Sequence, residues 1–133
     1  MSQVRDAMVP EPGTLEASAT AQEAGERLSE PAVRAVLVTD DGKLVGVITR
    51  KTLVSRVVAP GLDPRSTKLK EVAEPPLFTL DASMDLDEAF HALEEHDFER
   101  VPVVEDGRLV GILSRTVLQR RLAEDEPPPE LEP

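Results

Sequence analysis

The chain repeats itself, and this repetition limits its possible folds more than any other feature of the sequence. The decapeptide DGKLVGVITR at residues 41–50 returns as DGRLVGILSR at residues 106–115, with six identical positions. When the chain is aligned with itself so that Asp41 meets Asp106, the register holds without a gap for more than forty residues. The sequence therefore predicts a tandem duplication, with copies at residues 4–58 and 69–122 and a turn-rich linker at residues 59–68.

Each copy is too short to form a stable domain alone. The chain has 133 residues, so each copy contains about 60, and a domain of that size buries only a small core. The hydrophobic content of 40% is ordinary, but the only aromatic residues are three Phe, so Val, Leu, Ile and Ala must build the core. We therefore expect the two copies to fold together.

Composition and charge argue against several classes of function. The chain has no cysteine, which rules out disulfides, thiolate metal sites and cysteine nucleophiles. Its formal net charge of −11 argues against nucleic acid and anionic membranes as partners, because both require a basic surface. No apolar run has the length of a signal peptide core or a membrane span, so we expect a soluble, cytoplasmic protein. Residues 123–133 are acidic and rich in Pro, which predicts a disordered tail.

A helix is predicted near the start of each copy. Thr20 and Asp85 have N-cap side chains, and each is followed three residues later by Glu. Behind the caps, apolar residues recur with the spacing i, i+3, i+4 and i+7 of one helix face. These residues are Ala21, Ala24, Gly25 and Leu28 in the first copy, and Leu86, Ala89, Phe90 and Leu93 in the second.

A β-hairpin is predicted next in each copy. The pairs Asp41-Gly42 and Asp106-Gly107 favour tight turns, because glycine takes positive φ without steric cost. The flanking segments are apolar at nearly every position, so we expect both faces of these strands to be buried. The strands are predicted at residues 35–38, 44–48, 101–104 and 109–113.

Together these elements predict the fold class. With a short strand near Thr14 or Thr79, each copy has the order strand, helix, strand, strand, helix. Thr49 and Ser114 end the last strands and are natural N-caps for helices that run to about residues 58 and 122. We therefore predict an α/β (α+β) fold, in which a small sheet carries helices on one face. Its other apolar face needs a cover, which the twin copy can supply.

Two such copies resemble a tandem pair of cystathionine beta-synthase (CBS) domains. The resemblance lies in the Asp-Gly hairpins, in an L-V-G-[VI]-[IL]-[TS] strand that leads into a helix, and in the V-P-V-V strand of the second copy. It covers the whole chain apart from the tail. It implies a pseudo-twofold Bateman module that binds AMP, ADP, ATP or S-adenosylmethionine in clefts between the copies. It also implies regulation, a homodimer and a separate, unknown effector protein.

The strand-to-helix junctions have features that suit an anionic nucleotide. A helix N-terminus offers unpaired N–H groups and the positive end of the helix dipole. Gly46 and Gly111 allow another backbone to approach closely. The alternatives are structural: hydroxyl groups that only cap helices, glycines that serve close packing between the copies, and arginines on solvated faces. The nearby basic residues are Arg34, Arg50, Lys51, Arg100 and Arg115.

The ribose-binding pattern implied by the resemblance is incomplete in both copies. It consists of Thr or Ser at the strand end, two further residues, and an Asp whose carboxylate accepts both ribose hydroxyls. Thr49 and Ser114 match the first position, but Thr52 and Val117 stand where the Asp belongs. A hydrogen bond to a charged group contributes about 1.5–3 kcal/mol, so we expect adenosine binding to be weakened roughly 10- to 100-fold.

The two implied clefts are unequal, because Arg100 takes the family's phosphate-contacting position whereas its equivalent in the first copy is Ala35. Phe78 is interpreted as a ring that stacks on adenine or, equally, as plain core. The favoured first cleft contains Val47, Thr49, Arg50, Lys51 and Thr52, closed by Leu77, Phe78 and Arg100. The second contains Ile112, Ser114, Arg115, Thr116 and Val117, facing Pro12, Gly13 and Arg34.

Catalysis and metal binding are not expected, and no cofactor is required. The sequence contains no nucleophile elbow, P-loop, Rossmann fingerprint or metal-ligand spacing. His91 and His96 are five residues apart, so they do not share a helix face as i, i+4 ligands would. Two hypotheses remain: a regulatory module that senses an adenine nucleotide or adenosyl ligand, and a ligand-free module for dimerisation or protein interaction. The cations near the first cleft favour the former, and the missing carboxylates favour the latter.

Overall fold

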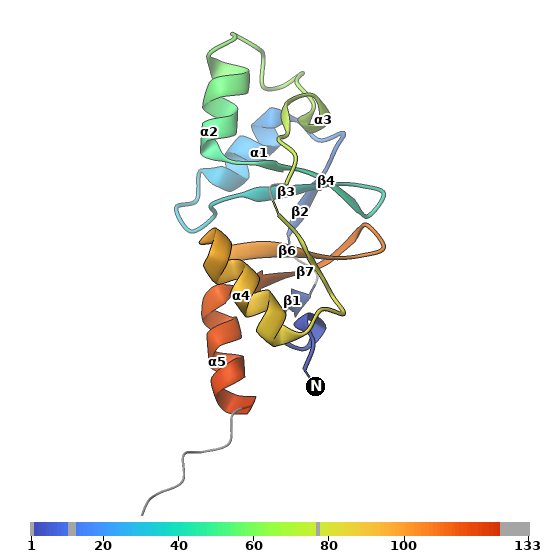
Figure 1. Cartoon of the computed structure of the whole chain (residues 1–133). Helices are drawn as coiled ribbons and strands as arrows, with labels where there is room; N and C mark the ends of the chain where they lie inside the picture. Colours follow the sequence, from blue (N-terminus) through green and yellow to red (C-terminus); the bar gives the residue numbers. More distant parts are fainter. Residues whose placement is uncertain (1, 11–12, 77, 126–133) are drawn as a thin grey trace, which may run out of the picture. The chain divides into compact units, whose positions relative to one another are not determined.

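The computed structural model describes residues 2–10, 13–76 and 78–125, and the chain divides into two compact units (Figure 1). The first-repeat unit comprises residues 13–77 together with the hairpin turn 106–109. The second-repeat unit comprises residues 1–12, 78–105 and 110–133. Each unit contains short strands and helices, as the predicted α/β fold class requires.

The first-repeat unit has the predicted order strand, helix, strand, strand, helix. In its sheet, β2 runs parallel to β3 and β3 runs antiparallel to β4, with Val38 opposite Gly46. At the hairpin turn, Lys43 of β4 pairs with Arg108. The elements are β2 (Thr14–Glu16), α1 (Ala21–Leu28), β3 (Val36–Asp40), β4 (Lys43–Ile48), α2 (Arg50–Leu53), the π-helical turn η2 (Val54–Val58) and α3 (Leu69–Val72).

The second-repeat unit has the same order of elements. Here β5 is parallel to β6, and β1 is antiparallel to β7, with Val9 opposite Ile112. The elements are the 3-10 turn η1 (Val4–Asp6), β1 (Val9–Pro10), β5 (Leu80–Asp81), α4 (Leu86–His96), β6 (Arg100–Glu105), β7 (Arg108–Ser114) and α5 (Arg115–Asp125).

Both predicted helix starts are confirmed. Thr20 and Glu23 form a complete capping box, in which the Glu23 N–H donates to Thr20 Oγ1 at 3.3 Å and the Thr20 N–H donates to Glu23 Oε2 at 3.0 Å. Asp85 caps α4 differently, because its carboxylate accepts the N–H of Asp87 at 2.8 Å. In both helices the first, second and last members of the predicted apolar face are buried.

Both predicted hairpin turns are also confirmed. Asp41 has φ 52° and Gly42 has φ 82°, and the equivalent Asp106 and Gly107 have φ 53° and 79°. Two successive residues with positive φ define the type I′ turn, whose twist matches that of the flanking strands. The first Asp-Gly pair therefore sets the register of β3 with β4 next to the turn, where Asp40 is opposite Lys43, before the register shifts between Val38 and Thr39.

The N-terminal segment of each repeat belongs to the unit built from the other repeat, which the sequence did not predict. In the second-repeat unit, the Val4 N–H donates to the carbonyl of Met84 at 2.8 Å. In the first-repeat unit, the Leu69 N–H donates to the carbonyl of Ala19, also at 2.8 Å. Val4 and Leu69 are both fully buried, so each unit takes an essential core residue from the other copy.

Each unit has its own hydrophobic core, and the two cores use equivalent positions. Aliphatic residues fill both, as the composition predicts, and their helices contribute the apolar faces identified from the spacing. The first-repeat core contains Ala17, Ala21, Ala24, Leu28, Val36, Val38, Ile48, Val57, Leu69 and Val72. The second-repeat core contains Val4, Ala7, Leu80, Ala82, Leu86, Ala89, Leu93, Val101, Val103, Leu113 and Leu118.

The prediction that the hairpin strands are buried on both faces holds only for β3. Residues Val36 to Thr39 of β3 are buried in succession. In β6, by contrast, Val101 and Val103 are buried while Pro102 and Val104 are half-exposed, and β4 and β7 alternate in the same way near their ends. Apolar residues on the second face therefore did not guarantee complete burial.

The last helix is longer than predicted. Helix α5 extends to Asp125, so residues 123–125, which were predicted to begin the tail, are helical. Residues 126–133 of the predicted acidic tail lie outside the described residues.

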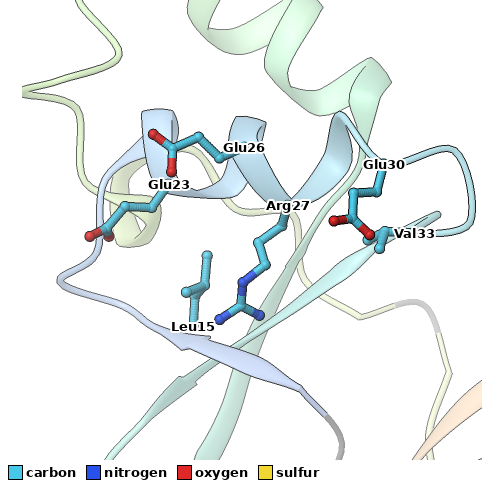
Figure 2. Close-up of a pocket in the computed structure, with 6 residues that line it drawn as sticks. All are labelled: Leu15, Glu23, Glu26, Arg27, Glu30 and Val33. Atoms are coloured by element: carbon cyan, nitrogen blue, oxygen red, sulfur yellow. The ribbon is translucent and has the colours of Figure 1, made fainter.

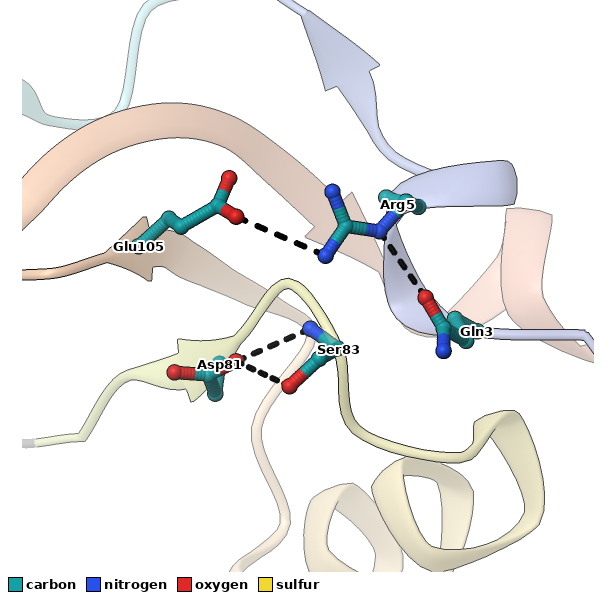
Figure 3. Close-up of polar contacts among 5 residues, drawn as sticks. All are labelled: Gln3, Arg5, Asp81, Ser83 and Glu105. Carbon is teal, nitrogen blue, oxygen red and sulfur yellow. Dashed lines mark hydrogen bonds and ion pairs between the residues drawn. The ribbon is translucent and has the colours of Figure 1, made fainter.

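Polar contacts fasten the start of the second-repeat unit (Figure 3). The carboxylate of Asp81, at the end of β5, accepts the Ser83 hydroxyl at 2.6 Å and the Ser83 N–H at 2.9 Å. Beside it, Arg5 pairs with Glu105 at 3.5 Å and donates to Gln3 Oε1 at 2.9 Å. The Ser83 hydroxyl, then the Ser83 N–H and the Arg5 charge, hold the pKa of Asp81 below its ordinary value of 3.8.

This lowered pKa predicts a pH dependence for the effect of Ser83→Ala. Because the folded-state pKa of Asp81 is depressed, its stabilising contribution is present above the unfolded-state value near 3.8 and is lost as pH falls through the folded-state pKa. We expect Ser83→Ala to lower the free energy of unfolding at pH 7 and to have a smaller effect near pH 3. Urea titrations at both pH values measure the difference.

The equivalent substitution Ser18→Ala is the control, because in the described structure Glu16 of the first repeat bonds to Thr39 at 3.3 Å and not to Ser18. An equal effect of Ser83→Ala at pH 7 and pH 3 contradicts the role assigned to Asp81.

Candidate functional site

The predicted residues of the first repeat come together at the end of β4 and the start of α2. Val47 forms an antiparallel bridge with Glu74, in which each residue donates its N–H to the other's carbonyl, at 2.8 and 3.0 Å. Gly46 makes this approach possible, because a Cβ there would lie 2.6 Å from the Cβ of Ala73 and 3.2 Å from the Glu74 carbonyl oxygen. The glycine thus serves close packing of one repeat's chain against the other's, which was one of the two interpretations.

Thr49 and Thr52 form a reciprocal cap at the start of α2. The Thr49 N–H donates to Thr52 Oγ1 at 3.0 Å, the Thr52 N–H donates to Thr49 Oγ1 at 3.2 Å, and the two hydroxyl oxygens are 2.9 Å apart. The Thr52 hydroxyl also donates to Glu74 Oε1 at 3.1 Å. Thr52 is only 1% exposed, and its hydroxyl is occupied by groups of the protein.

The cations of the first repeat differ in how much they are engaged. The Arg50 guanidinium donates to the carbonyls of Glu30 at 2.9 Å and Val33 at 2.8 Å, so it fastens the loop between α1 and β3. Lys51 and Arg34 are exposed, and neither forms an ion pair within the described part of the chain. Lys51 and Arg34 are therefore the predicted cations of this repeat that remain available to an anion.

The equivalent junction of the second repeat has apolar residues in place of the Thr52–Glu74 pair. The Val117 N–H donates to Ser114 Oγ at 3.1 Å, which confirms Ser114 as the cap of α5. Val117 and Val9 are 37% and 58% exposed and stand where the first repeat has Thr52 and Glu74. Ile112 and Ser114 are half-buried and Thr116 is exposed.

Arg115 is committed to its own unit. Its guanidinium pairs with the carboxylates of Asp97 at 3.3 Å and Glu99 at 2.5 Å. The backbone N–H of Arg115 donates to the backbone carbonyl of Glu99 at 2.8 Å. These two carboxylates offset its charge, so Arg115 fastens the segment before β6 much as Arg50 fastens the segment before β3. The sequence prediction that Arg115 meets a ligand gains no support from these contacts.

Phe78 lies in an aromatic cluster of the second-repeat unit. Its ring centroid is 5.5 Å from that of Phe98 and 5.1 Å from that of His96, and the rings of His96 and Phe98 are 5.8 Å apart. Phe78 is half-buried and packs against the core, so it serves as core at least in part. Arg100 is exposed. Leu77 lies outside the described residues, and the joining of Leu77, Phe78 and Arg100 to the first-repeat residues stays a prediction.

Two hollows on the first-repeat unit have no predicted ligand residue in their lining. One, of about 370 Å³, is lined by Leu15, Glu23, Glu26, Arg27, Glu30 and Val33 (Figure 2). Its Arg27 guanidinium lies beside Leu15, and three glutamates also line the hollow, so its net charge disfavours a phosphate. The other, of about 620 Å³, is lined by Ser55, Arg56, Pro60, Leu62, Ser66, Thr67, Glu71 and Val72.

Neither a metal centre nor a membrane span is found in the part of the chain that the structure describes. Among those residues, no group of three or more His, Asp or Glu side chains is arranged to hold a metal ion. None of their helices combines the length and apolar character needed to cross a bilayer.

The Thr49–Thr52 cap predicts a stability difference between the repeats. Thr52→Val deletes a buried hydroxyl and leaves the Thr49 N–H without its acceptor, so we expect a loss of about 1–3 kcal/mol in the free energy of unfolding. The reverse substitution at the equivalent position, Val117→Thr, changes an exposed residue and should alter stability by less than about 0.5 kcal/mol. Chemical denaturation followed by far-UV circular dichroism compares the two, and equal losses would contradict the buried cap.

Comparison with known proteins is consistent with this geometry. The profile of the CBS domain matches residues 4–59 and again residues 69–124. Hypoxic response protein 1 of Mycobacterium tuberculosis is 36% identical over 85 residues, which cover 64% of this chain and 59% of that protein.

Two solved structures share the fold across nearly the whole chain. The crystal structure of Hypoxic Response Protein I with two coordinated zinc ions has a TM-score of 0.76 at 30% identity, covering 91% of this chain and 99% of that chain. The crystal structure of CBSX2 in complex with AMP has a TM-score of 0.73 at 28% identity, covering 93% and 98%. Because the family profile matches twice, once in each repeat, the chain belongs to the CBS domain family and carries a tandem pair of CBS domains.

Proposed function

We propose that this CBS pair is a regulatory module that binds an adenine nucleotide or related adenosyl ligand and signals to a separate partner protein. CBS pairs are regulatory modules, and proteins like these are generally not catalytic. The observation that carries the proposal is the likeness of 93% of the chain to CBSX2, whose structure was solved in complex with AMP.

The first-repeat junction supports the proposal chemically. It presents the half-buried carboxylate of Glu74 next to the Thr49–Thr52 cap, and the exposed ammonium group of Lys51 follows Thr49 by two residues. A ribosyl phosphate carries both hydroxyl donors, which suit a carboxylate, and an anionic group, which suits a cation. We place the ligand at this junction because the second-repeat junction offers Val9 and Val117 in the corresponding positions.

Calorimetric titration of the purified chain with AMP, ATP and S-adenosylmethionine tests the proposal. We expect at least one of them to bind with a dissociation constant below about 1 mM, equivalent to more than about 4 kcal/mol of binding free energy. Uridine monophosphate is the control, since it keeps the ribose and phosphate but lacks adenine. Zinc chloride provides a separate titration, because one structural neighbour holds zinc. The absence of any adenosyl binding at millimolar concentration would refute the sensor function.

A second candidate function, ligand-free dimerisation, is favoured by exposed apolar side chains after α2. Val54, Val58 and Leu62 are 59%, 69% and 45% exposed. These aliphatic residues recur every fourth position over residues 54–62, and exposed apolar side chains that lie near one another are a common sign of a protein interface. This candidate needs no ribose acceptor, and it agrees with the missing Asp at position 52.

Dimerisation through this surface predicts a change of mass with one substitution. We expect the chain to sediment as a homodimer and Val58→Lys to shift it to a monomer, because a buried ammonium group without a partner opposes association. Val45→Lys, at a 45% exposed position on β4, is the matched control and should leave the dimer intact. Sedimentation velocity measures the oligomeric state of the wild-type chain and both variants. A monomeric wild-type chain would refute dimerisation as the function.

A further inference from the structure

The two repeats differ together at two positions that touch each other in the first repeat. Thr52 contacts Glu74 through a hydrogen bond of 3.1 Å. In the repeat alignment, the equivalents of Thr52 and Glu74 are Val117 and Val9. A polar pair in one copy is thus replaced by an apolar pair in the other.

The backbone holds residues 74 and 9 in equivalent places. Glu74 pairs antiparallel with Val47, and Val9 pairs antiparallel with Ile112, which is the equivalent of Val47. Glycine makes both approaches possible: Gly46 lies against Ala73 and Glu74, and Gly111 lies against Met8 and Val9. Because the framework is the same, the difference between the copies lies in the side chains, and the polar pair exists at the first-repeat junction alone among the described residues.

The hydrogen-bond directions orient the Glu74 carboxylate. The Thr52 hydroxyl gives its single hydrogen to Glu74 Oε1, so it accepts from the Thr49 N–H and the Thr49 hydroxyl. Thr52 is 1% exposed, which fixes the position of that donor. One oxygen of Glu74 is therefore anchored, while the side chain as a whole is half-buried.

The other carboxylate oxygen of Glu74 has no partner within the described residues. The ion pairs of that part of the chain join Arg5 to Glu105 and Arg115 to Asp97 and Glu99, and none reaches Glu74. A half-buried carboxylate gains stability from hydrogen-bond donors that replace lost water. The second oxygen is not among the buried side-chain atoms without a partner in the described structure, so it reaches solvent and can accept a hydrogen bond from a ligand.

We propose that Glu74 supplies the acceptor for the ribose hydroxyls of the ligand, in place of the Asp that position 52 lacks. This inference rests on the proposed function and specifies its chemistry. The Glu74 carboxylate bonds to Thr52 Oγ1 at 3.1 Å, so it lies beside position 52. The free oxygen and the remaining lone pair of Oε1 accept the two hydroxyl donors of a vicinal diol. The side chains of Val9 and Val117 contain no acceptor, so each chain binds one ribosyl ligand, at the first-repeat junction.

Comparison of AMP with 2′-deoxy-AMP on the wild-type chain and on Glu74→Gln tests the role. The amide keeps an acceptor for the Thr52 hydroxyl, so the variant retains the cap, but it loses the charge and one acceptor. We expect wild type to bind AMP roughly 10- to 100-fold more tightly than 2′-deoxy-AMP, since the lost hydrogen bond is to a charged group. In Glu74→Gln this preference should fall to less than about threefold. Glu95→Gln, which removes one exposed acid of α4, is the charge-matched control and should keep the preference.

A second variant guards against a folding defect. Thr52→Val combined with Glu74→Val copies the second repeat's pair, and its unfolding midpoint shows whether the junction is intact. We expect this folded variant to bind AMP and 2′-deoxy-AMP equally. Wild type that binds AMP, with an unchanged preference in both variants, overturns the role of Glu74 and leaves the proposed function standing. Wild type that binds none of AMP, ATP and S-adenosylmethionine overturns the proposed function itself, and the role of Glu74 with it. If ATP binds and AMP does not, the comparison is made with ATP and 2′-deoxy-ATP, and the same outcomes decide it.

Discussion

The structure depends on backbone hydrogen bonds that bind the beginning of each repeat to the unit formed by the other. The Val4 N–H bonds to the Met84 carbonyl, and at the equivalent position of the second copy the Leu69 N–H bonds to the Ala19 carbonyl. These bonds position Val4 and Leu69, which are fully buried, within the two cores. Because an aliphatic core of this size is small, removal of such a residue would leave a cavity that few neighbours can fill. Each unit is therefore complete only when both repeats are present in the chain.

The attachment of the second repeat's first residues to the first-repeat unit also positions the candidate site. Continuing from α3, the chain brings Ala73 and Glu74 alongside β4, where Gly46 leaves room for them. Glu74 thus belongs to the second repeat by sequence but lies at the first repeat's strand-to-helix junction. Core packing and site geometry share one cause, because the buried anchor at Leu69 and the carboxylate at Glu74 are only five residues apart on one short segment.

Local signals allowed the regular part of the fold to be predicted. The Asp-Gly pairs indicated both type I′ turns, and Thr20 and Asp85 indicated both helix starts, because each rule depends on a few adjacent residues. No such signal marks η1, β1 or α3, since a 3-10 turn, a two-residue strand and a four-residue helix have too few residues for a hydrophobic period. Those segments are formed by tertiary contacts. The contribution of Glu74 was missed for the same reason, although the joint change of Thr52 with Val117 and of Glu74 with Val9 was present in the repeat alignment.

Identities between the repeats thus identify the fold, and differences between them identify the candidate site. Electrostatics leads to the same junction. Two of the predicted ligand cations, Arg50 and Arg115, are occupied by carbonyls and carboxylates of their own units. In a chain of net charge −11, the long-range field repels an anion, and salt weakens that repulsion beyond about 10 Å. Recognition of a nucleotide by such a chain must then rely on short-range, oriented groups, of which the anchored carboxylate of Glu74 and the nearby ammonium of Lys51 are the clearest in the described structure.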